Sequence, residues 1–254
     1  MLVSGLARRV GTVPLTGFAL AGILGVLAVV AWLAVAQASM PMAGTLDATA
    51  LVLFTLIWGV GMVAMMFPSL VPLVYAVTVS ARKSSEDRQA PRFLRRLAVS
   101  TRAGLFIGGY VAVWTLVGVA FYLAIASLEL VGVSVGMGVF GFWAALALIA
   151  TGLYQFSRFK QRALMECRSP MSFILTRWRN GNSGAGIMGA DYGLFCTRCC
   201  WVLMAGLLTV GTMSLPLMGV FSIVIFLEKI APFGPLISKL VGAGFIGTGI
   251  FLLV

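Results

Sequence analysis

Apolar residues recur along this chain in seven long runs, and the shorter segments between them hold nearly all of its charge. The runs cover residues 14–36, 50–79, 103–126, 134–156, 196–213, 215–230 and 236–254. Most have about the 20 residues that a helix needs to cross roughly 30 Å of hydrocarbon. They lack the alternation of a membrane barrel. The pattern predicts an all-α, polytopic transmembrane helix bundle of about seven spans, as one integral membrane domain over residues 1–254.

The fifth and sixth runs are the least certain to be separate. Residues 199–227 are almost continuously apolar, and only the segment from Thr212 to Pro216 suggests a reversal between two short helices. Pro216 suits the first turn of a following helix, where a missing N–H leaves no hydrogen bond unmade. One long tilted helix is the alternative, and it would give six spans.

The basic residues favour seven spans and a cytoplasmic N-terminus. The 18 Lys and Arg residues fall into four groups, at 8–9, 82–102, 158–198 and 229–239. With seven spans, all four groups lie on the cytoplasmic side, as the positive-inside rule requires. The segments 80–102 and 157–193 are therefore predicted as basic cytoplasmic loops.

Composition supports the membrane assignment. Hydrophobic residues make up 61% of the chain and charged residues 10%, whereas a soluble domain is nearer half apolar and a quarter charged. The net charge of +11 follows from topology, and it predicts attraction to anionic lipid headgroups rather than nucleic-acid binding. The first apolar run exceeds the 7–15 residues of a signal-peptide core, so we expect a retained helix.

The residue types present exclude several chemistries. The chain has no histidine and only seven carboxylate side chains, so Ser-His-Asp and Cys-His arrangements are absent. No glycine loop for phosphate and no close carboxylate pair within a span is evident. We therefore expect a protein that is not an enzyme. A reactive thiol beside Arg198 is the one enzymatic alternative, because a neighbouring cation favours the thiolate.

The four cysteines carry the candidate chemistry. Cys196, Cys199 and Cys200 stand at i, i+3 and i+4 at the predicted mouth of a span, so Cys196 shares a helix face with both others. Met204 follows one turn later, and Cys167 lies in the preceding basic segment, from which it could close over the row.

These sulfur ligands suit Cu(I), whereas tetrahedral zinc would need all four cysteines. Zinc is less favoured, because adjacent Cys199 and Cys200 point about 100° apart on a helix. The structural alternative is that the cysteines are small apolar fillers. A disulfide is disfavoured, because the predicted cytoplasmic face is reducing.

Methionines provide a second, weaker set of soft ligands. Met62, Met65 and Met66 lie in the second run, where Pro68 and Pro72 predict a kink. The others in this set are Met40, Met42 and Met213. Such thioethers could pass Cu(I) along the bundle, although methionine is also a flexible filler of apolar cores.

Several segments occur in an order that resembles a known family. They run from Tyr154 to Lys160, from Cys167 to Pro170, from Gly193 to Met204, from Gly211 to Met213, and over Glu228 and Lys229. The chain resembles, over roughly residues 50–250, a bacterial family of predicted metal-binding integral membrane proteins of uncharacterised function, sometimes labelled copper chaperones. The resemblance implies a copper-handling protein of the bacterial inner membrane.

The chain departs from that family at positions that concern the metal. The family usually has a cysteine where this chain has Ala163 and a histidine where it has Tyr192. Arg198 stands where the family often has glycine. Two readings follow: a cytoplasmic-facing Cu(I) site, or a non-catalytic accessory subunit of a larger membrane complex that has lost metal ligands. Other membrane proteins or a second copy of the chain are the expected partners.

Overall fold

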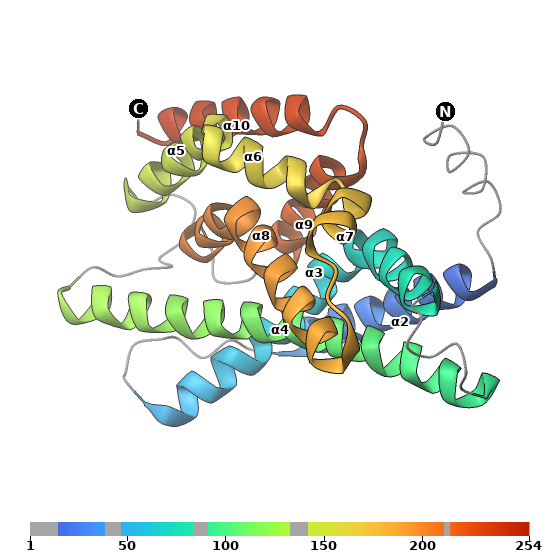
Figure 1. The fold of residues 1–254 in the computed structure, drawn as a ribbon. Coiled ribbons are helices and arrows are strands. Elements are labelled where there is room, and N and C mark those ends of the chain that lie inside the picture. The colour runs from blue at the N-terminus through green and yellow to red at the C-terminus, as the bar shows by residue number, and fades with distance from the viewer. Residues whose placement is uncertain (1–14, 39–46, 84–90, 133–141, 211–213, 254) are drawn as a thin grey trace.

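The computed structural model describes residues 15–38, 47–83, 91–132, 142–210 and 214–253, and every regular element among them is an α-helix. In chain order these are α2 (Leu15–Gln37), α3 (Ala48–Lys83), α4 (Arg92–Leu130), α5 (Phe142–Phe156), α6 (Arg158–Cys167), α7 (Pro170–Arg177), α8 (Gly181–Val210), α9 (Leu215–Ile230) and α10 (Gly234–Phe251). Figure 1 shows how they are arranged. The predicted all-α fold is confirmed.

Within the described ranges, five helices are long and apolar enough to cross a membrane. These stretches are Ala19–Gln37, Ala48–Arg82, Arg96–Leu130, Gly181–Leu208 and Gly234–Phe251. Helices α5 and α9 are also apolar but have only 15 and 16 residues. Each of the seven predicted apolar runs therefore overlaps a helix. The number of membrane crossings and the side on which the N-terminus lies remain predictions.

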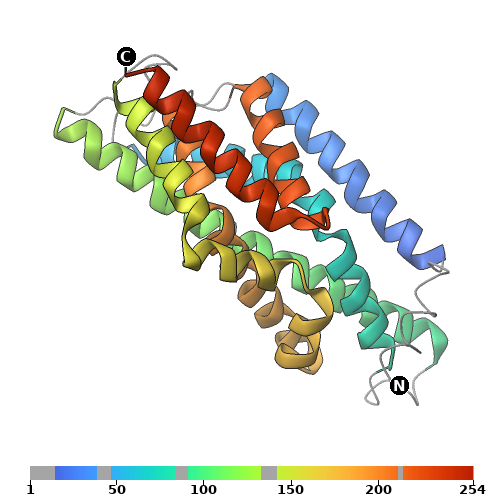
Figure 2. The same cartoon turned by 90° about the horizontal axis from the view of Figure 1, so that it is seen from above.

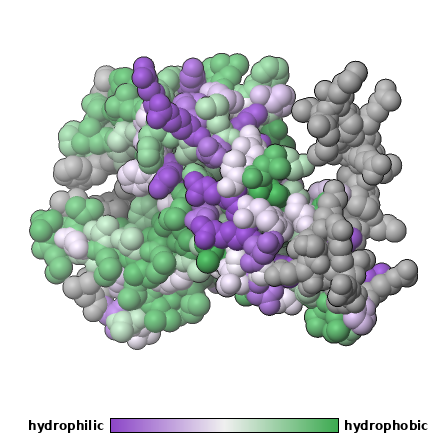
Figure 3. Space-filling model, viewed as in Figure 1, coloured by the Kyte–Doolittle hydropathy of each residue, from purple (hydrophilic) through white to green (hydrophobic). Residues whose placement is uncertain are grey.

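The outer surface of the bundle is apolar over wide areas. Large side chains such as Leu33, Leu116, Leu153 and Leu240 are exposed on four different helices. Figure 3 shows this apolar surface, with hydrophilic side chains gathered over α6 and the start of α8. Exposed apolar areas of this extent are unusual for soluble monomers and suit contact with lipid.

The chain from Cys196 to Ile230 forms parts of two helices rather than one long helix. Helix α8 ends at Val210 and α9 begins at Leu215, so the single long helix is wrong. Pro216 lies in the first turn of α9, as its missing N–H favours. Residues 211–213, including Met213, lie outside the described part of the chain.

Helix α8 begins at Gly181 rather than at residue 196, so the segment 157–193 is largely helical. That segment, suggested as a loop by its charge, contains α6, α7 and the first half of α8. The start of α8 was missed because it is rich in glycine, which ordinarily weakens a helix. A helix of such residues is favoured when it lies against a neighbour, because small residues let two backbones approach closely.

Glycines do bring α8 against α4. A methyl group added at Gly189 would overlap the carbonyl of Phe106, and one added at Gly109 would overlap the carbonyl of Gly186. Helix α8 also packs on α5, α6 and α9, which makes it central to the bundle. Figure 2 shows α2 and α10 farther out, with α10 alongside α5.

Local signals place the short helices beside α8. Ser157 separates α5 from α6, and its side chain accepts a hydrogen bond from the backbone N–H of Lys160 at 3.1 Å. Such a cap satisfies one of the free N–H groups at a helix start. Pro170 then begins α7. Helix α6 therefore ends at Cys167 and presents that residue to α8.

The glycine contact can be tested with one substitution made at two positions. Gly189→Ala should lower the stability of the bundle by about 1–3 kcal/mol, because the new methyl group overlaps α4. Gly186→Ala should be neutral or slightly stabilising, because its methyl group would meet its nearest atom at 3.8 Å. Thermal unfolding of both variants in mild detergent measures the difference. Equal stability of the two variants would contradict the proposed packing.

Candidate metal centre

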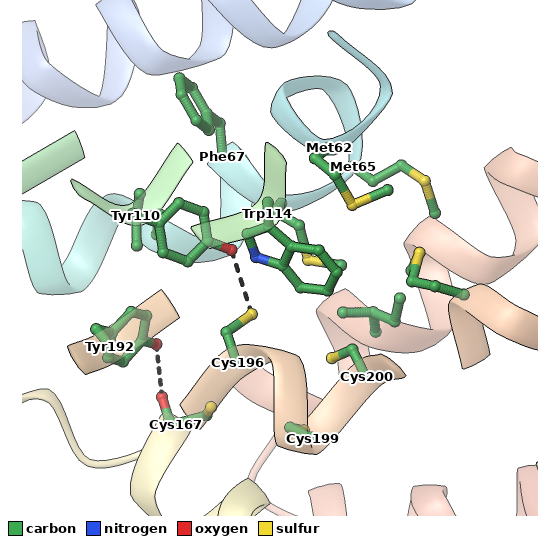
Figure 4. Close-up of a cluster of buried hydrophobic side chains, with 14 of the residues drawn as sticks. Met62, Met65, Phe67, Tyr110, Trp114, Cys167, Tyr192, Cys196, Cys199 and Cys200 are labelled. Atoms are coloured by element: carbon green, nitrogen blue, oxygen red, sulfur yellow. Dashed lines mark hydrogen bonds between the residues drawn. The ribbon is translucent and has the colours of Figure 1, made fainter. Parts of the chain in front are cut away.

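The structure brings the four cysteines into one buried region. Cys196, Cys199 and Cys200 lie on α8 with exposed fractions of 0%, 1% and 0%, and Cys167 at the end of α6 is 4% exposed. The thiol of Cys167 interacts with those of Cys196 and Cys199, and the thiol of Cys200 interacts with those of Cys196 and Cys199. All four are free thiols. Figure 4 shows them gathered where α6 meets α8.

The cysteines lie deeper than the sequence suggested. They were expected at the mouth of a span that begins at residue 196. Because α8 begins at Gly181, Cys196 stands near the middle of the helix. The expectation that the helix begins at Cys196 is therefore wrong, and the reason is the glycine-rich first half of α8.

Lys229 provides the positive charge at this region. Its Nζ donates to the Cys196 sulfur at 3.0 Å, and it lies 3.4 Å from Ser69 Oγ and 3.6 Å from Met66 Sδ. An ammonium group beside a sulfur stabilises the thiolate form. The lysine is itself buried. Because neither the ammonium group nor the sulfur can contact water, each serves as the polar partner of the other.

Tyr110 is the second polar partner of Cys196. Its hydroxyl oxygen lies 3.2 Å from the sulfur, and Figure 4 shows Tyr110 and Trp114 on one side of the cysteines. This part of α4 was not identified from the sequence. A buried tyrosine usually finds a partner for its hydroxyl group, but composition and spacing do not identify which one.

Arg198 does not supply charge to the thiols. Its side chain is exposed, and its guanidinium carbon lies 5.8 Å from the centre of the Phe195 ring. Neighbouring residues on a helix point about 100° apart, so Arg198 turns outward where Cys199 turns inward. The arginine that suggested a reactive thiol therefore lies on another face of α8.

Cys167 is held by its backbone and by its sulfur. The Tyr192 hydroxyl donates to the Cys167 carbonyl oxygen at 3.1 Å. The hydrogen bond with the Cys196 sulfur raises the pKa of the Cys167 thiol well above its ordinary value, and burial adds to this effect. Cys167 is therefore a thiol rather than a thiolate at neutral pH.

The two departures noted in the sequence lie next to this region. Ala163 is buried one helical turn before Cys167, and Tyr192 is buried one turn before Cys196. Residues one turn apart share a helix face. Ala163 and Tyr192 therefore face the same part of the bundle as the thiols.

The methionines contribute unequally. Met204 is fully buried, one turn beyond Cys200 on α8. Met66 reaches the region through its contact with Lys229. Met62 and Met65 are buried in the same core. Met40 and Met42 lie outside the described residues.

The comparison with known proteins can now be set beside this geometry. A family model, PpoB2, described as copper chaperone, matches residues 55–252. The chain belongs to this copper chaperone family. The matched region includes all four cysteines and Lys229, and the predicted resemblance is confirmed. No curated protein and no solved structure matches the chain.

Among the described residues, no group of three or more Cys, Asp or Glu side chains has an arrangement that could hold an ion. Zinc requires four such ligands at fixed tetrahedral positions. The donor set here is sulfur, which suits Cu(I) chemically.

A buried ion pair fixes the elements around the thiols. Lys160 Nζ on α6 lies 2.7 Å from Glu228 Oε2 on α9, with side-chain exposures of 0% and 1%. Gln155 Nε2 donates to Glu228 Oε1 at 3.1 Å, and Ser238 Oγ donates to Gln155 Oε1 at 3.2 Å. Glu228 therefore pairs with Lys160 rather than with its neighbour Lys229, since adjacent residues on a helix diverge.

Lys160 keeps its charge inside this network. Burial acts to lower the pKa of Lys160, but attraction to Cys199 and Glu228 outweighs burial and raises the pKa above its ordinary value. The Lys160 ammonium group therefore keeps its positive charge at neutral pH.

Removal of one partner tests the role of this pair. Glu228→Gln should destabilise the protein by about 3–5 kcal/mol, because it leaves a buried ammonium without its counter-charge. Asp191→Asn is the matched control, since Asp191 pairs with Arg179 at 3.7 Å in a partly exposed position. Such a pair contributes about 1 kcal/mol or less. Thermal unfolding in detergent compares the two, and similar losses would argue against a structural role for Glu228.

Proposed function

We propose that this protein binds Cu(I) as cargo through the thiols of α8 and acts as a carrier in the membrane, not as an enzyme. The observation that carries the proposal is the contact among four free, buried cysteines, in a chain that belongs to a copper chaperone family. Thiolate and thioether sulfurs are soft ligands, and Cu(I) is the common biological ion that suits them best.

The proposed primary ligands are Cys196 and Cys200. They lie one turn apart on α8, and their sulfurs interact. Cys199 or Cys167 is the proposed third ligand, and Met204 an auxiliary thioether. Two or three sulfurs are enough for Cu(I), whereas tetrahedral zinc needs four ligands.

Charge balance supports the same choice. Cu(I) between two thiolates carries one net negative charge, and a charge buried in an apolar bundle is costly unless it is paired. Lys229, which already contacts Cys196, supplies one positive charge. The net charge of Cu(I), two thiolates and Lys229 is zero, whereas a divalent ion in the same place would leave one positive charge unpaired.

We further propose that copper reaches the thiols from the cytoplasmic side. Cys167 ends a helix that carries two exposed basic side chains, Arg158 and Arg162. Lysine and arginine gather on the cytoplasmic side of bacterial membrane proteins. Integral insertion in the inner membrane, with the basic side chains near anionic lipid headgroups, is part of the same proposal.

A non-catalytic accessory subunit is the second candidate. It is favoured by the polar contacts that Cys196 already makes with Lys229 and Tyr110, because they satisfy the sulfur without a metal. Ala163 and Tyr192 in the places of two family ligands favour it also. Purification in mild detergent tests it, since an accessory subunit should retain other membrane proteins in fixed proportion and a carrier should not.

Metal content is the direct test of the proposed site. Anaerobically purified protein, loaded with Cu(I) against a competing chelator, should hold about one copper ion per chain. The Cys196→Ser/Cys200→Ser variant should lose it, while Thr197→Ala, on the same turn, should not. Elemental mass spectrometry measures the ratio. Equal copper in all three proteins, with helicity unchanged, would refute the ligand assignment.

Lys229 should control which ion is accepted. Lys229→Met removes the charge with similar side-chain length, and it should raise the affinity for Zn(II) relative to Cu(I) by roughly tenfold or more, because nearby charges interact strongly in a buried site. Lys229→Arg should retain the preference for Cu(I), and Lys239→Met, at an exposed position, should not alter it. Competitive titration with both ions gives the ratio. A purely structural role would weaken both affinities together.

A further inference from the structure

A cavity of about 230 Å³ lies beside the thiols and is open on one side. Its lining includes Ser69 from α3, Cys167 and Lys229 from the thiol region, and Tyr192 from α8. Ile230, at its edge, is 47% exposed, whereas Cys167 and Lys229 are buried. The cavity therefore runs from the surface of the protein to Cys167 of the cluster and to Lys229, the residue that contacts Cys196.

The walls of this cavity are positively charged. Arg168 and Lys229 both line it, and its described lining contains no acidic side chain. Arg168 is fixed by two hydrogen bonds, from Nη1 to the Glu228 carbonyl at 2.7 Å and from Nη2 to the Pro232 carbonyl at 3.1 Å. A cleft lined by charges of one sign attracts ions of the opposite sign. This cavity should attract anions and repel a free copper cation.

The size of the cavity limits what can enter. Pockets for drug-sized ligands measure about 300–1,000 Å³, so this one admits only a small molecule or one end of it. Small thiols bind Cu(I) as anionic complexes with two thiolates, written [Cu(SR)₂]⁻. Such a complex has the charge that the walls favour and a compact copper–sulfur centre.

We propose that this cavity is where copper is loaded, and that copper arrives as the anionic complex of Cu(I) with a small thiol. The inference rests on the proposed function, since it concerns how the same site receives its cargo. Cys167 is the first protein sulfur that the complex meets. The Tyr192 hydroxyl, bonded to the Cys167 carbonyl, holds that residue at the cavity wall.

Loading is then two ligand exchanges at copper, with no change in its oxidation state. In the first, Cys167 forms a copper–sulfur bond, its proton passes to one small thiolate, and that group leaves as RSH. In the second, the Cys196 thiolate forms a bond to copper and the other small thiolate leaves as RS⁻. The product is Cu(I) between the thiolates of Cys167 and Cys196, and its negative charge lies beside Lys229. Transfer within the protein then completes the proposed site: Cys200 forms a bond to copper, its proton passes to the Cys167 sulfur, and the bond between copper and Cys167 breaks.

Charged thiol reagents test the cavity without copper. Full-length, reduced protein in detergent is treated with 2-sulfonatoethyl methanethiosulfonate, an anion, or with its trimethylammonioethyl analogue, a cation. Each forms a mixed disulfide with a cysteine thiolate and releases methanesulfinate. Rates at Cys167, followed by peptide mass spectrometry, are divided by the rate of each reagent with 2-mercaptoethanol, so that thiolate fraction and intrinsic reactivity cancel in the comparison.

The expected result is that Cys167 reacts before Cys199 and Cys200, with the normalised rate about tenfold higher for the anion than for the cation. Arg168→Gln should reduce this ratio and Arg168→Lys should keep it, while Lys239→Gln, on the exposed face of α10, should leave it unchanged. An equal rate for both reagents, or no effect of Arg168→Gln in a folded variant, would overturn the inference.

Copper uptake completes the test and separates the two proposals. The wild-type chain should take up Cu(I) faster from its glutathione complex, an anion, than from its acetonitrile complex, a cation. Arg168→Gln should slow the first without changing the final copper content. No uptake from either source would refute the proposed function. Uptake at equal rates, with normal final content, would leave the function standing and refute the loading route.

Discussion

The ion pair of Lys160 with Glu228 sets the geometry on which the thiol region depends. Neither charge can reach water, so each requires the other, and α6 and α9 are held in one relation. The same two helices carry Cys167 and Lys229. Once the pair has formed, Cys167 faces α8 from one side, and Lys229, turned about 100° away from Glu228, reaches the sulfur of Cys196.

The second determinant is the close contact of α4 with α8. Glycines at 109 and 189 leave no room for a side chain between the two backbones. The contact brings Tyr110 within 3.2 Å of the Cys196 sulfur. It also allows a glycine-rich segment to remain helical, which places the cysteines halfway along α8. Packing thus decides where the chemistry lies, as expected in lipid, where helices associate through shape.

The sequence was sufficient for what depends on local pattern. Each of the seven apolar runs overlaps a helix of the structure. Pro216 correctly indicated the boundary between α8 and α9. The start of α8 was missed, because glycine favours loops unless a neighbouring helix is known. The partners of Glu228 and Lys229 were also missed, since they lie 68 and 33 residues away along the chain. Such pairings require the fold itself, although the cysteines that they surround could be found from their spacing.

The burial of Cys196 halfway along α8 affects the rate of copper exchange rather than the affinity for copper. Under the proposed function, a copper ion bound at Cys196 would be shielded from dioxygen by the surrounding helices. The same shielding would make its departure slow, because the ion would have to leave through the cavity beside Cys167 or wait until packed helices separate. A carrier built in this way suits steady supply of a scarce ion better than rapid response to an excess.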